Sequence, residues 1–197
     1  MTTDAWLVAR AKGGDDDAFD QLVVRHQRVL YRLAIRLTGN RADAEDVLQD
    51  VFFQAFRRLK SFRGDSQFGT WLYRIAVNAA LMRRRQSRRT RADPLETYLP
   101  QFRSDGRHRR IDVDYSAASR IEALVQRREL KKLLLDAITR LPGRYRAAVV
   151  LCDLEELPAR EAARVLRVDE RAVRQRVHRA RLMLRGYLDV VAQGVER

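Results

Sequence analysis

The chain has 197 residues, 46% of them hydrophobic, and a formal net charge of +14 that comes mostly from arginine. This apolar content is sufficient for a packed core and excludes a wholly disordered basic tail. The single cysteine, Cys152, excludes an internal disulfide, and with three scattered histidines it makes no metal cluster, so we expect no metal and no other cofactor. A protein this basic usually binds a polyanion, because guanidinium groups suit phosphates and guanine edges.

The N-terminal stretch carries no pattern for export. Residues 1–17 contain no apolar segment of the signal-peptide type, and no apolar run approaches the length needed to cross a bilayer. We therefore expect a cytoplasmic protein without membrane insertion.

Apolar residues recur at helical spacing through the first half of the chain. The pattern predicts helices at about residues 15–39, 41–59 and 68–85, separated by glycine-containing breaks. Acidic residues at the start of the first helix suit the positive end of its dipole. The second helix is expected to bury Val47, Leu48, Val51, Phe52, Ala55 and Phe56.

Helical periodicity then fails. Residues 83–110 hold ten arginines, three acids and two prolines but few apolar side chains, a composition too charged to pack. Helical spacing resumes near Ser119, and no segment alternates as a strand does. The prediction is an all-α protein with two small helical domains, residues 1–88 and 119–190, joined by a flexible basic linker at 89–118 and followed by a tail at 191–197.

Residues 157–185 have the pattern of a short helix, a tight turn and a long cationic helix. Asp169 is a good N-cap for the second helix, and nine arginines but only three acids lie within residues 160–185. This arrangement is typical of a helix-turn-helix that lays its second helix in the major groove of DNA. The alternative is the arginine-rich, solvated face of an ordinary helical hairpin. The expected apolar stripe of the long helix is Val173, Val177, Ala180 and Leu184.

Four segments together resemble the extracytoplasmic-function group of bacterial sigma factors. They are DAFDQLVVRHQRVLYRLAIRLTG, DAEDVLQDVFFQAFRRL, SFRGDSQFGTWLYRIAVNAA and LPGRYRAAVVLCDLEELPAREAARVL, in the order and at the separation of that family. The resemblance implies a first domain, sigma region 2, that binds core RNA polymerase and opens the −10 promoter element. It implies a second domain, sigma region 4, whose helix-turn-helix reads the −35 element. An anti-sigma partner is a further expectation from the family, which the sequence neither shows nor excludes.

Three carboxylates share one face of the second predicted helix. Asp43, Asp46 and Asp50 are spaced at i, i+3 and i+7, with Gln49 and Phe53 bordering the face. On so basic a protein, an acidic strip beside an apolar residue is a candidate protein-binding surface. Compensation of the helix dipole is the alternative, which explains Asp43 and Asp46 but not Asp50, about two turns into the helix. The resemblance implies that core RNA polymerase binds this acidic face, made of Asp43, Asp46, Gln49, Asp50 and Phe53.

The segment at residues 61–78 combines aromatic side chains, a glycine-containing loop and a basic helix. Unpaired bases are held by stacking on aromatic rings, at ~1–3 kcal/mol per base. Taken alone, these aromatics are better explained as core residues, and we expect Trp71 to be one. The resemblance implies that Phe62 and Asn78 hold a base flipped out of the −10 element. The residues expected at that element, called the −10 set, are Ser61, Phe62, Arg63, Tyr73, Arg74, Asn78 and Arg84.

The resemblance likewise places Arg174, Gln175, His178 and Arg179 in the −35 major groove. Arginine can bond guanine O6 and N7, and glutamine can bond adenine N6 and N7. Other arginines are expected to hold phosphates and set orientation. The −35 set is Arg160, Arg171, Arg174, Gln175, His178, Arg179 and Arg181.

One turn residue departs from the family pattern. The position that is usually glycine is Arg167, and a non-glycine residue in left-handed conformation costs ~1–2 kcal/mol.

Other functions fit the sequence less well. The chain shows no nucleophile, metal set or phosphate loop, so we expect no enzymatic activity. A nucleic-acid-processing enzyme would need a carboxylate pair from two elements, whereas Asp43, Asp46 and Asp50 share one helix. The main alternative is a free-standing helix-turn-helix regulator, which would bind palindromic sites as a dimer.

Overall fold

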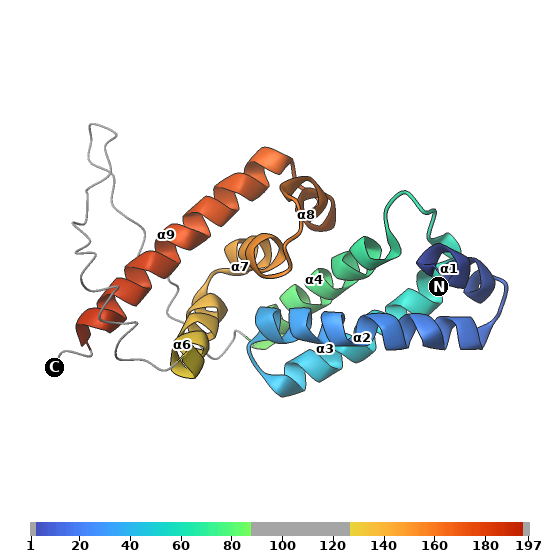
Figure 1. Cartoon of the computed structure of the whole chain (residues 1–197), viewed down its shortest axis with the longest axis horizontal. Coiled ribbons are helices and arrows are strands. Elements are labelled where there is room, and N and C mark those ends of the chain that lie inside the picture. The colour runs from blue at the N-terminus through green and yellow to red at the C-terminus, as the bar shows by residue number, and fades with distance from the viewer. Residues whose placement is uncertain (1–2, 88–126, 195–197) are drawn as a thin grey trace.

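The computed structural model describes residues 3–87 and 127–194, and every regular element within these ranges is a helix (Figure 1). The N-terminal half contains α1 (Asp4–Lys12), α2 (Asp16–Thr38), α3 (Arg41–Arg58), the short 3₁₀ turn η1 (Leu59–Ser61) and α4 (Phe68–Ser87). The C-terminal half contains α6 (Arg127–Arg140), α7 (Gly143–Val149), the π-helical turn η3 (Val150–Leu154), α8 (Ala159–Leu166) and α9 (Glu170–Gly194).

Local sequence signals explain where these helices begin and end. The Asp15 carboxylate accepts the backbone N–H of Ala18 at 3.0 Å and caps α2, which ends at Gly39 in left-handed conformation. The Asp169 carboxylate caps α9 by accepting the N–H of Ala172 at 2.6 Å, as predicted. The predicted linker at 89–118 lies outside the described residues, and α9 continues to Gly194, inside the segment predicted as a tail.

In the N-terminal half, α2, α3 and α4 pack against one another and α1 lies on α2. Trp71 is 7% exposed, which confirms its predicted place in the core. The prediction for Phe56 is wrong, because this side chain is 55% exposed and meets Phe19 edge-on, with ring centroids 5.1 Å apart. Leu59 takes the buried position at the end of α3, where the chain turns into η1.

In the C-terminal half, α7 and α8 both pack on α9, and α8 and α9 form the predicted helix-turn-helix. The turn between these two helices contains Arg167, which has φ 53° and ψ 48°. This non-glycine residue therefore holds a left-handed conformation, which costs ~1–2 kcal/mol. The predicted stripe of α9 is buried at Val173, Val177, Ala180 and Leu184.

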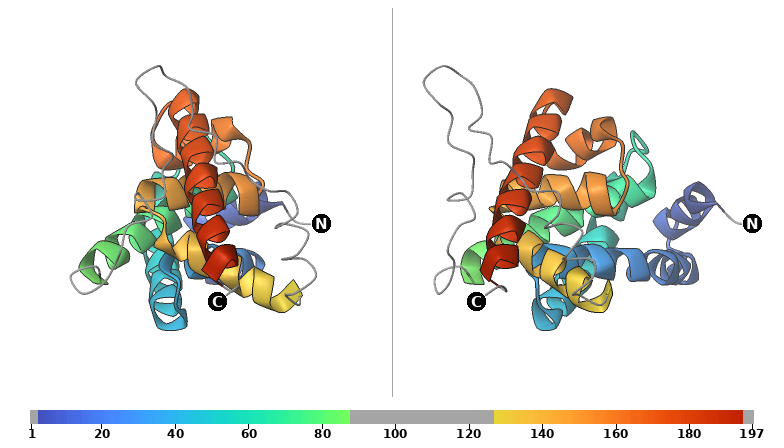
Figure 2. Two further views of the ribbon diagram at one scale, coloured as in Figure 1. Left: turned by 90° about the vertical axis from the view of Figure 1, so that its left-hand side faces the viewer. Right: turned by 60° about the vertical axis from the view of Figure 1, so that its left-hand side comes forward.

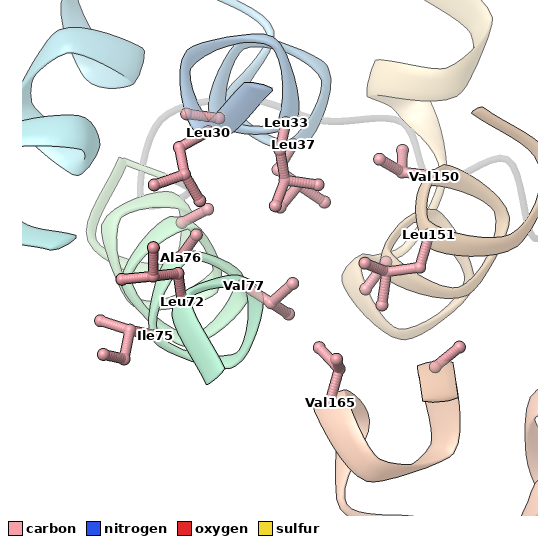
Figure 3. Close-up of a cluster of buried hydrophobic side chains, with 14 of the residues drawn as sticks. Leu30, Leu33, Leu37, Leu72, Ile75, Ala76, Val77, Val150, Leu151 and Val165 are labelled. Atoms are coloured by element: carbon pink, nitrogen blue, oxygen red, sulfur yellow. The ribbon is translucent and has the colours of Figure 1, made fainter. Parts of the chain in front are cut away.

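The two halves pack directly on each other and share one hydrophobic core (Figures 1 and 2). In Figure 3, Leu33 and Leu37 of α2 and Val77 of α4 lie opposite Val150 and Leu151 of η3. Helix α8 also packs against α4. We call this packing of the C-terminal half on α2 and α4 the closed arrangement.

Candidate polymerase and promoter interfaces

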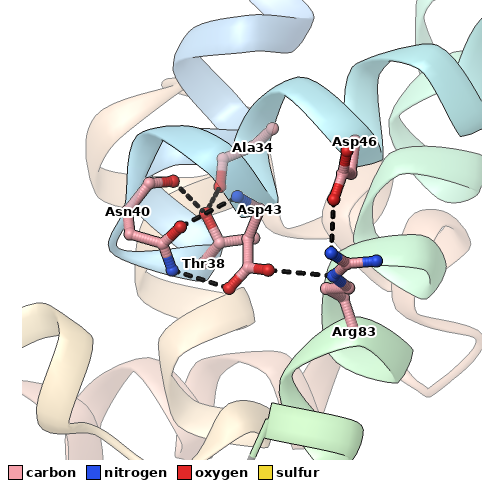
Figure 4. A network of polar contacts seen from close by, with 6 residues as sticks. All are labelled: Ala34, Thr38, Asn40, Asp43, Asp46 and Arg83. Carbon is pink, nitrogen blue, oxygen red and sulfur yellow. Dashed lines mark hydrogen bonds and ion pairs between the residues drawn. The ribbon is translucent and has the colours of Figure 1, made fainter.

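The acidic face on α3 is organised by an arginine from α4. Arg83 donates from Nε to Asp43 at 2.8 Å and also forms an ion pair with Asp46 (Figure 4). Asn40 accepts the Asp43 backbone N–H at 2.8 Å and donates its amide to the Asp43 carboxylate at 2.6 Å. These hydrogen bonds, from Asn40 first and Arg83 second, lower the pKa of Asp43 below its usual value of 3.8.

The remainder of the acidic face points into solvent. Gln49 and Asp50 are exposed, and Phe53 is 60% exposed with the Arg57 guanidinium 5.6 Å from its ring centroid. An exposed aromatic ring beside exposed polar groups is a typical composition for a protein-binding surface. The structure therefore divides the face into a half that is paired with Arg83 and an open half around Asp50.

Part of the −10 set lines a hollow between the two halves of the molecule. This hollow, of about 650 Å³, has walls from the 61–66 loop, the start of α4 and the end of α8. The ring of Phe62 is half-buried, with its centroid 5.7 Å from that of Phe68 and 5.1 Å from that of Trp71. The −10 residues that line this hollow are Ser61, Phe62, Arg63 and Arg74.

Asn78 does not line this hollow. It lines a second hollow of about 470 Å³, together with Arg84 of the −10 set and Arg176 of α9. Asn78 is exposed and stands about two helical turns from Trp71. The structure thus does not bring Phe62 and Asn78 into one cavity.

The two remaining members of the −10 set, Tyr73 and Arg84, contact the C-terminal half. Arg84 donates to the Thr139 carbonyl at 2.8 Å. Burial, followed by the neighbouring Glu155 carboxylate, raises the pKa of Tyr73 to about 12. The Tyr73 and Arg84 side chains of α4 therefore face the C-terminal half in the closed arrangement.

Every member of the −35 set is exposed to solvent. Arg174, Gln175, His178 and Arg179 are all exposed, and their spacing places them on one face of α9. Arg174 pairs with Glu170 one turn earlier on the same helix. Arg181 is held by two hydrogen bonds to the Asp153 carboxylate, at 2.9 and 2.8 Å. The two other members, Arg160 and Arg171, are exposed.

Comparison with known proteins decides the family. The sigma-70 region 2 family matches residues 22–90, and the sigma-70 region 4 family matches residues 131–184. The ECF RNA polymerase sigma factor SigM of Mycobacterium tuberculosis is 38% identical over 98% of this chain and 88% of the relative. The chain belongs to the ECF sigma factors. The ECF RNA polymerase sigma-E factor of Escherichia coli is also 38% identical, over 91% of both chains.

A solved structure agrees with this family and with the fold. CnrH in complex with the cytosolic domain of CnrY superposes with a TM-score of 0.65 and 29% sequence identity, over 95% of this chain and 97% of that chain. The residues predicted to bind polymerase and the −10 element thus lie within the segment that matches region 2. The residues predicted to bind the −35 element lie within the segment that matches region 4. None of its described helices is both long and apolar enough to span a bilayer.

Three arginines that join separate helices of this sigma factor were not predicted from the sequence. Arg83 meets Asp43 and Asp46 from another helix, and Arg146 of α7 is buried at 1% exposure. Arg36 of α2 donates to the Leu154 carbonyl at 3.0 Å. The one available signal was the position of Arg146, inside an apolar run that is otherwise buried.

Proposed function

We propose that this sigma factor binds core RNA polymerase through the acidic face of α3, opens the −10 element with the −10 set, and reads the −35 element with α9. In this proposal residues 1–88 form the polymerase- and −10-binding domain. Residues 89–118 form the linker, and 119–190 form the −35-binding domain. The observation that carries the proposal is the coexistence of an exposed acidic–aromatic face and an exposed arginine face on opposite halves of one chain.

The open half of the acidic face is the best candidate for the polymerase contact. Asp50 and Phe53 are exposed and present a carboxylate beside a large apolar surface. Asp43 and Asp46 already have a cationic partner in Arg83, so their contribution to a new interface would be smaller. Asp50 and Phe53 should therefore contribute most to binding.

The arginine face of α9 suits sequence-specific contact with DNA. Arg174 and Gln175 stand side by side and can bond purine edges, while the arginines around them can hold phosphates. Removing a base-reading arginine should affect some sequences more than others, whereas removing a phosphate contact should weaken all sequences alike.

The two halves must separate for both promoter elements to be bound at once. The −10 and −35 elements lie roughly 25 base pairs apart, which is about 85 Å along B-form DNA. In the closed arrangement α8 packs on α4, and Arg84 bonds to the Thr139 carbonyl. The closed arrangement is consequently the form of the free chain, and the promoter-bound form has its halves apart.

The other expectations follow from the same proposal. The polymerase carries out the chemistry, the sigma factor has no enzymatic activity of its own, and it works in the cytoplasm, where the chromosome is. The structural relative CnrH was solved in complex with the cytosolic domain of CnrY, and we likewise expect a protein partner, an anti-sigma factor, for this chain.

Run-off transcription with purified core enzyme and a promoter library tests the proposal. Transcripts should depend on the added chain, and Asp50→Arg should abolish both these transcripts and co-purification with the core enzyme. The matched control is Glu45→Arg, the same charge reversal on another face of α3. Normal co-purification of the Asp50→Arg chain would refute the acidic-face assignment. A footprint on a palindrome without polymerase would instead indicate a free-standing regulator.

A further inference from the structure

The hollow of about 650 Å³ between the halves has an unusual lining. Its walls carry four arginines, with Arg63 and Arg74 from the N-terminal half and Arg164 and Arg167 from the C-terminal half. Hydroxyl groups also line it, and at its edge the Thr70 hydroxyl donates to the Glu161 carboxylate across the interface, at 3.5 Å. The cavity therefore exists only while the two halves are together.

The charge of this lining is not balanced by the protein. Against four guanidinium groups the wall contains one carboxylate, that of Asp65, and the Glu161 carboxylate lies at its edge. Within the described part of the chain, no ion pair joins any of the four arginines to an acid. Four like charges brought into one hollow repel each other, so the closed arrangement is less stable without an anion in the hollow than with one.

Arg167 supplies an independent observation. This residue holds φ 53° in the turn after α8, a left-handed conformation that costs a non-glycine residue ~1–2 kcal/mol. Glycine would remove that cost, yet the position carries a long cationic side chain that lines the hollow. Strained residues kept at the wall of a cavity commonly serve a ligand.

We propose that this hollow binds a small anion with a polyphosphate chain, and that the bound anion stabilises the closed arrangement. The four guanidinium groups outnumber the Asp65 carboxylate on the wall and the Glu161 carboxylate at its edge, so the hollow suits an anion with several negative charges. The volume falls within the ~300–1,000 Å³ of small-molecule sites, so it accommodates a triphosphate with or without a nucleoside. Arginine suits phosphate oxygens because its planar donors bond them in pairs.

Promoter DNA cannot fill this hollow as a whole, although Arg63 and Arg74 on its N-terminal wall belong to the −10 set. The walls come from both halves, and the two promoter elements that these halves would bind lie about 85 Å apart along the DNA, so the hollow is lost on the promoter. An anion that binds only the closed form shifts the chain toward that form by mass action. Binding of the anion should therefore compete with binding of the promoter. This competition rests on the proposed function, whereas the anion site itself does not.

Calorimetric titration of the full chain alone, without polymerase, promoter or divalent cations, tests the site. The probes are inorganic tripolyphosphate, ATP and adenosine, at 0.15 M salt so that remote charges are screened. Tripolyphosphate and ATP should bind and raise the unfolding temperature, while adenosine should not bind. Equal affinities for tripolyphosphate and ATP would show that the site recognises the phosphate chain alone. At least tenfold tighter binding of ATP would show that the site also recognises the nucleoside.

Variants from both walls give the decisive comparison. Arg167→Gly removes the guanidinium and the backbone strain together, so it should weaken tripolyphosphate binding at least tenfold without lowering the unfolding temperature. Arg164→Ala and Arg74→Ala should each weaken binding at least fivefold. The matched control is Arg185→Ala, an exposed arginine of α9 away from the hollow, which should change binding less than twofold.

Three results would overturn the proposal. They are absence of tripolyphosphate binding, equal weakening by Arg185→Ala and Arg167→Gly, and weakening by Arg74→Ala without any effect of Arg164→Ala. The last would place the anion on the N-terminal half alone. Because no polymerase is present, none of these results bears on promoter recognition itself.

Discussion

Arg146 of α7 donates from Nη1 to the backbone carbonyl of Leu37, at the C-terminal end of α2, over 2.6 Å. Its Nε donates to the carbonyl of Ile138 in the last turn of α6, at 2.8 Å. One guanidinium thus satisfies final carbonyls of two helices, one from each half of the molecule. A cation is favourable at the negative end of a helix dipole, which helps to offset the cost of burying Arg146 at 1% exposure.

Arg146→Met should therefore loosen the closed arrangement. The substitution preserves much of the apolar volume but removes both hydrogen bonds, each worth about 1.5–3 kcal/mol when the donor is charged. The free energy of unfolding should fall by roughly 3 kcal/mol, and the radius of gyration from small-angle scattering should rise as the halves separate. Arg28→Met, an exposed arginine of α2, is the control and should change neither quantity. An unchanged radius of gyration would show that other contacts hold the halves together.

The interface between the two halves can also be tested at Gly39, at the C-terminal end of α2. Gly39 has φ 90° and Gly14 has φ 94°, so alanine at either position costs a similar ~1–2 kcal/mol of backbone strain. A Cβ at Gly39 would lie 2.8 Å from Cγ2 of Thr139, in α6, whereas a Cβ at Gly14 would meet nothing within 4 Å.

Gly39→Ala should consequently destabilise the chain by about 1–3 kcal/mol more than Gly14→Ala, because of the added overpacking. Urea unfolding of the two variants measures this difference. Thr139→Ala should recover part of it in the double variant, since the clashing methyl is gone. Equal destabilisation by both alanines would mean that α6 moves away from Gly39 without cost.

The sequence predicted the features that depend on neighbours along the chain. The cap at Asp169 and the acidic start of α2 follow from local backbone chemistry. The burial of Phe56 was predicted wrongly, because helical spacing alone does not say where a buried stripe stops. The helix α1 was not predicted, since its nine residues carry a weak apolar pattern.

Long-range pairings could not be read from periodicity. Arg83 meets Asp43 across 40 residues of sequence, and Arg146 meets Leu37 across 109. A guanidinium on a flexible stem can reach many acceptors, so only the packed helices decide which one it bonds. The same holds for the two hollows, which separate Phe62 from Asn78 although the family resemblance joined them.

The contribution of Asp43 to the stability of the chain depends on pH, and the hydrogen bond from Asn40 is the main cause of its lowered pKa. Because the pKa of Asp43 is lowered in the folded chain, its contribution to stability is complete above the ordinary value of 3.8 and is lost as the pH falls through the lower, folded value. Asn40→Ala removes the largest cause of that shift and also the cap of α3. The pKa of Asp43 should rise toward 3.8, and stability at pH 7 should fall by about 1 kcal/mol from the lost cap.

Carbon-detected NMR titration of the Asp43 carboxyl measures this shift. Arg83→Met should raise the same pKa by a smaller amount, because Arg83 is the second cause. Thr38→Val is the control, since the Thr38 hydroxyl donates to the Ala34 carbonyl and does not bond to Asp43. A larger effect of Arg83→Met than of Asn40→Ala would reverse the assigned order of causes.

Arg174 is the sharpest test of base reading by α9. Its side chain is exposed and pairs only with Glu170 of its own helix among the described residues, so little rearrangement is needed for it to enter a groove. Arg174→Ala should cost ~1–3 kcal/mol at promoters with the preferred base in the −35 element and almost nothing at promoters that lack it. Binding of the reconstituted holoenzyme to single-base −35 variants, followed by fluorescence anisotropy, measures this selectivity.

Arg171→Ala is the matched comparison, because Arg171 is an exposed arginine of the same helix that we assign to a phosphate. It should weaken all promoters alike and reduce the dependence of log affinity on log salt by about one unit. The contrast between a base-dependent loss at Arg174 and a uniform loss at Arg171 carries the assignment. A uniform loss at both positions would reassign Arg174 to the phosphate backbone and leave base reading to Gln175, His178 and Arg179.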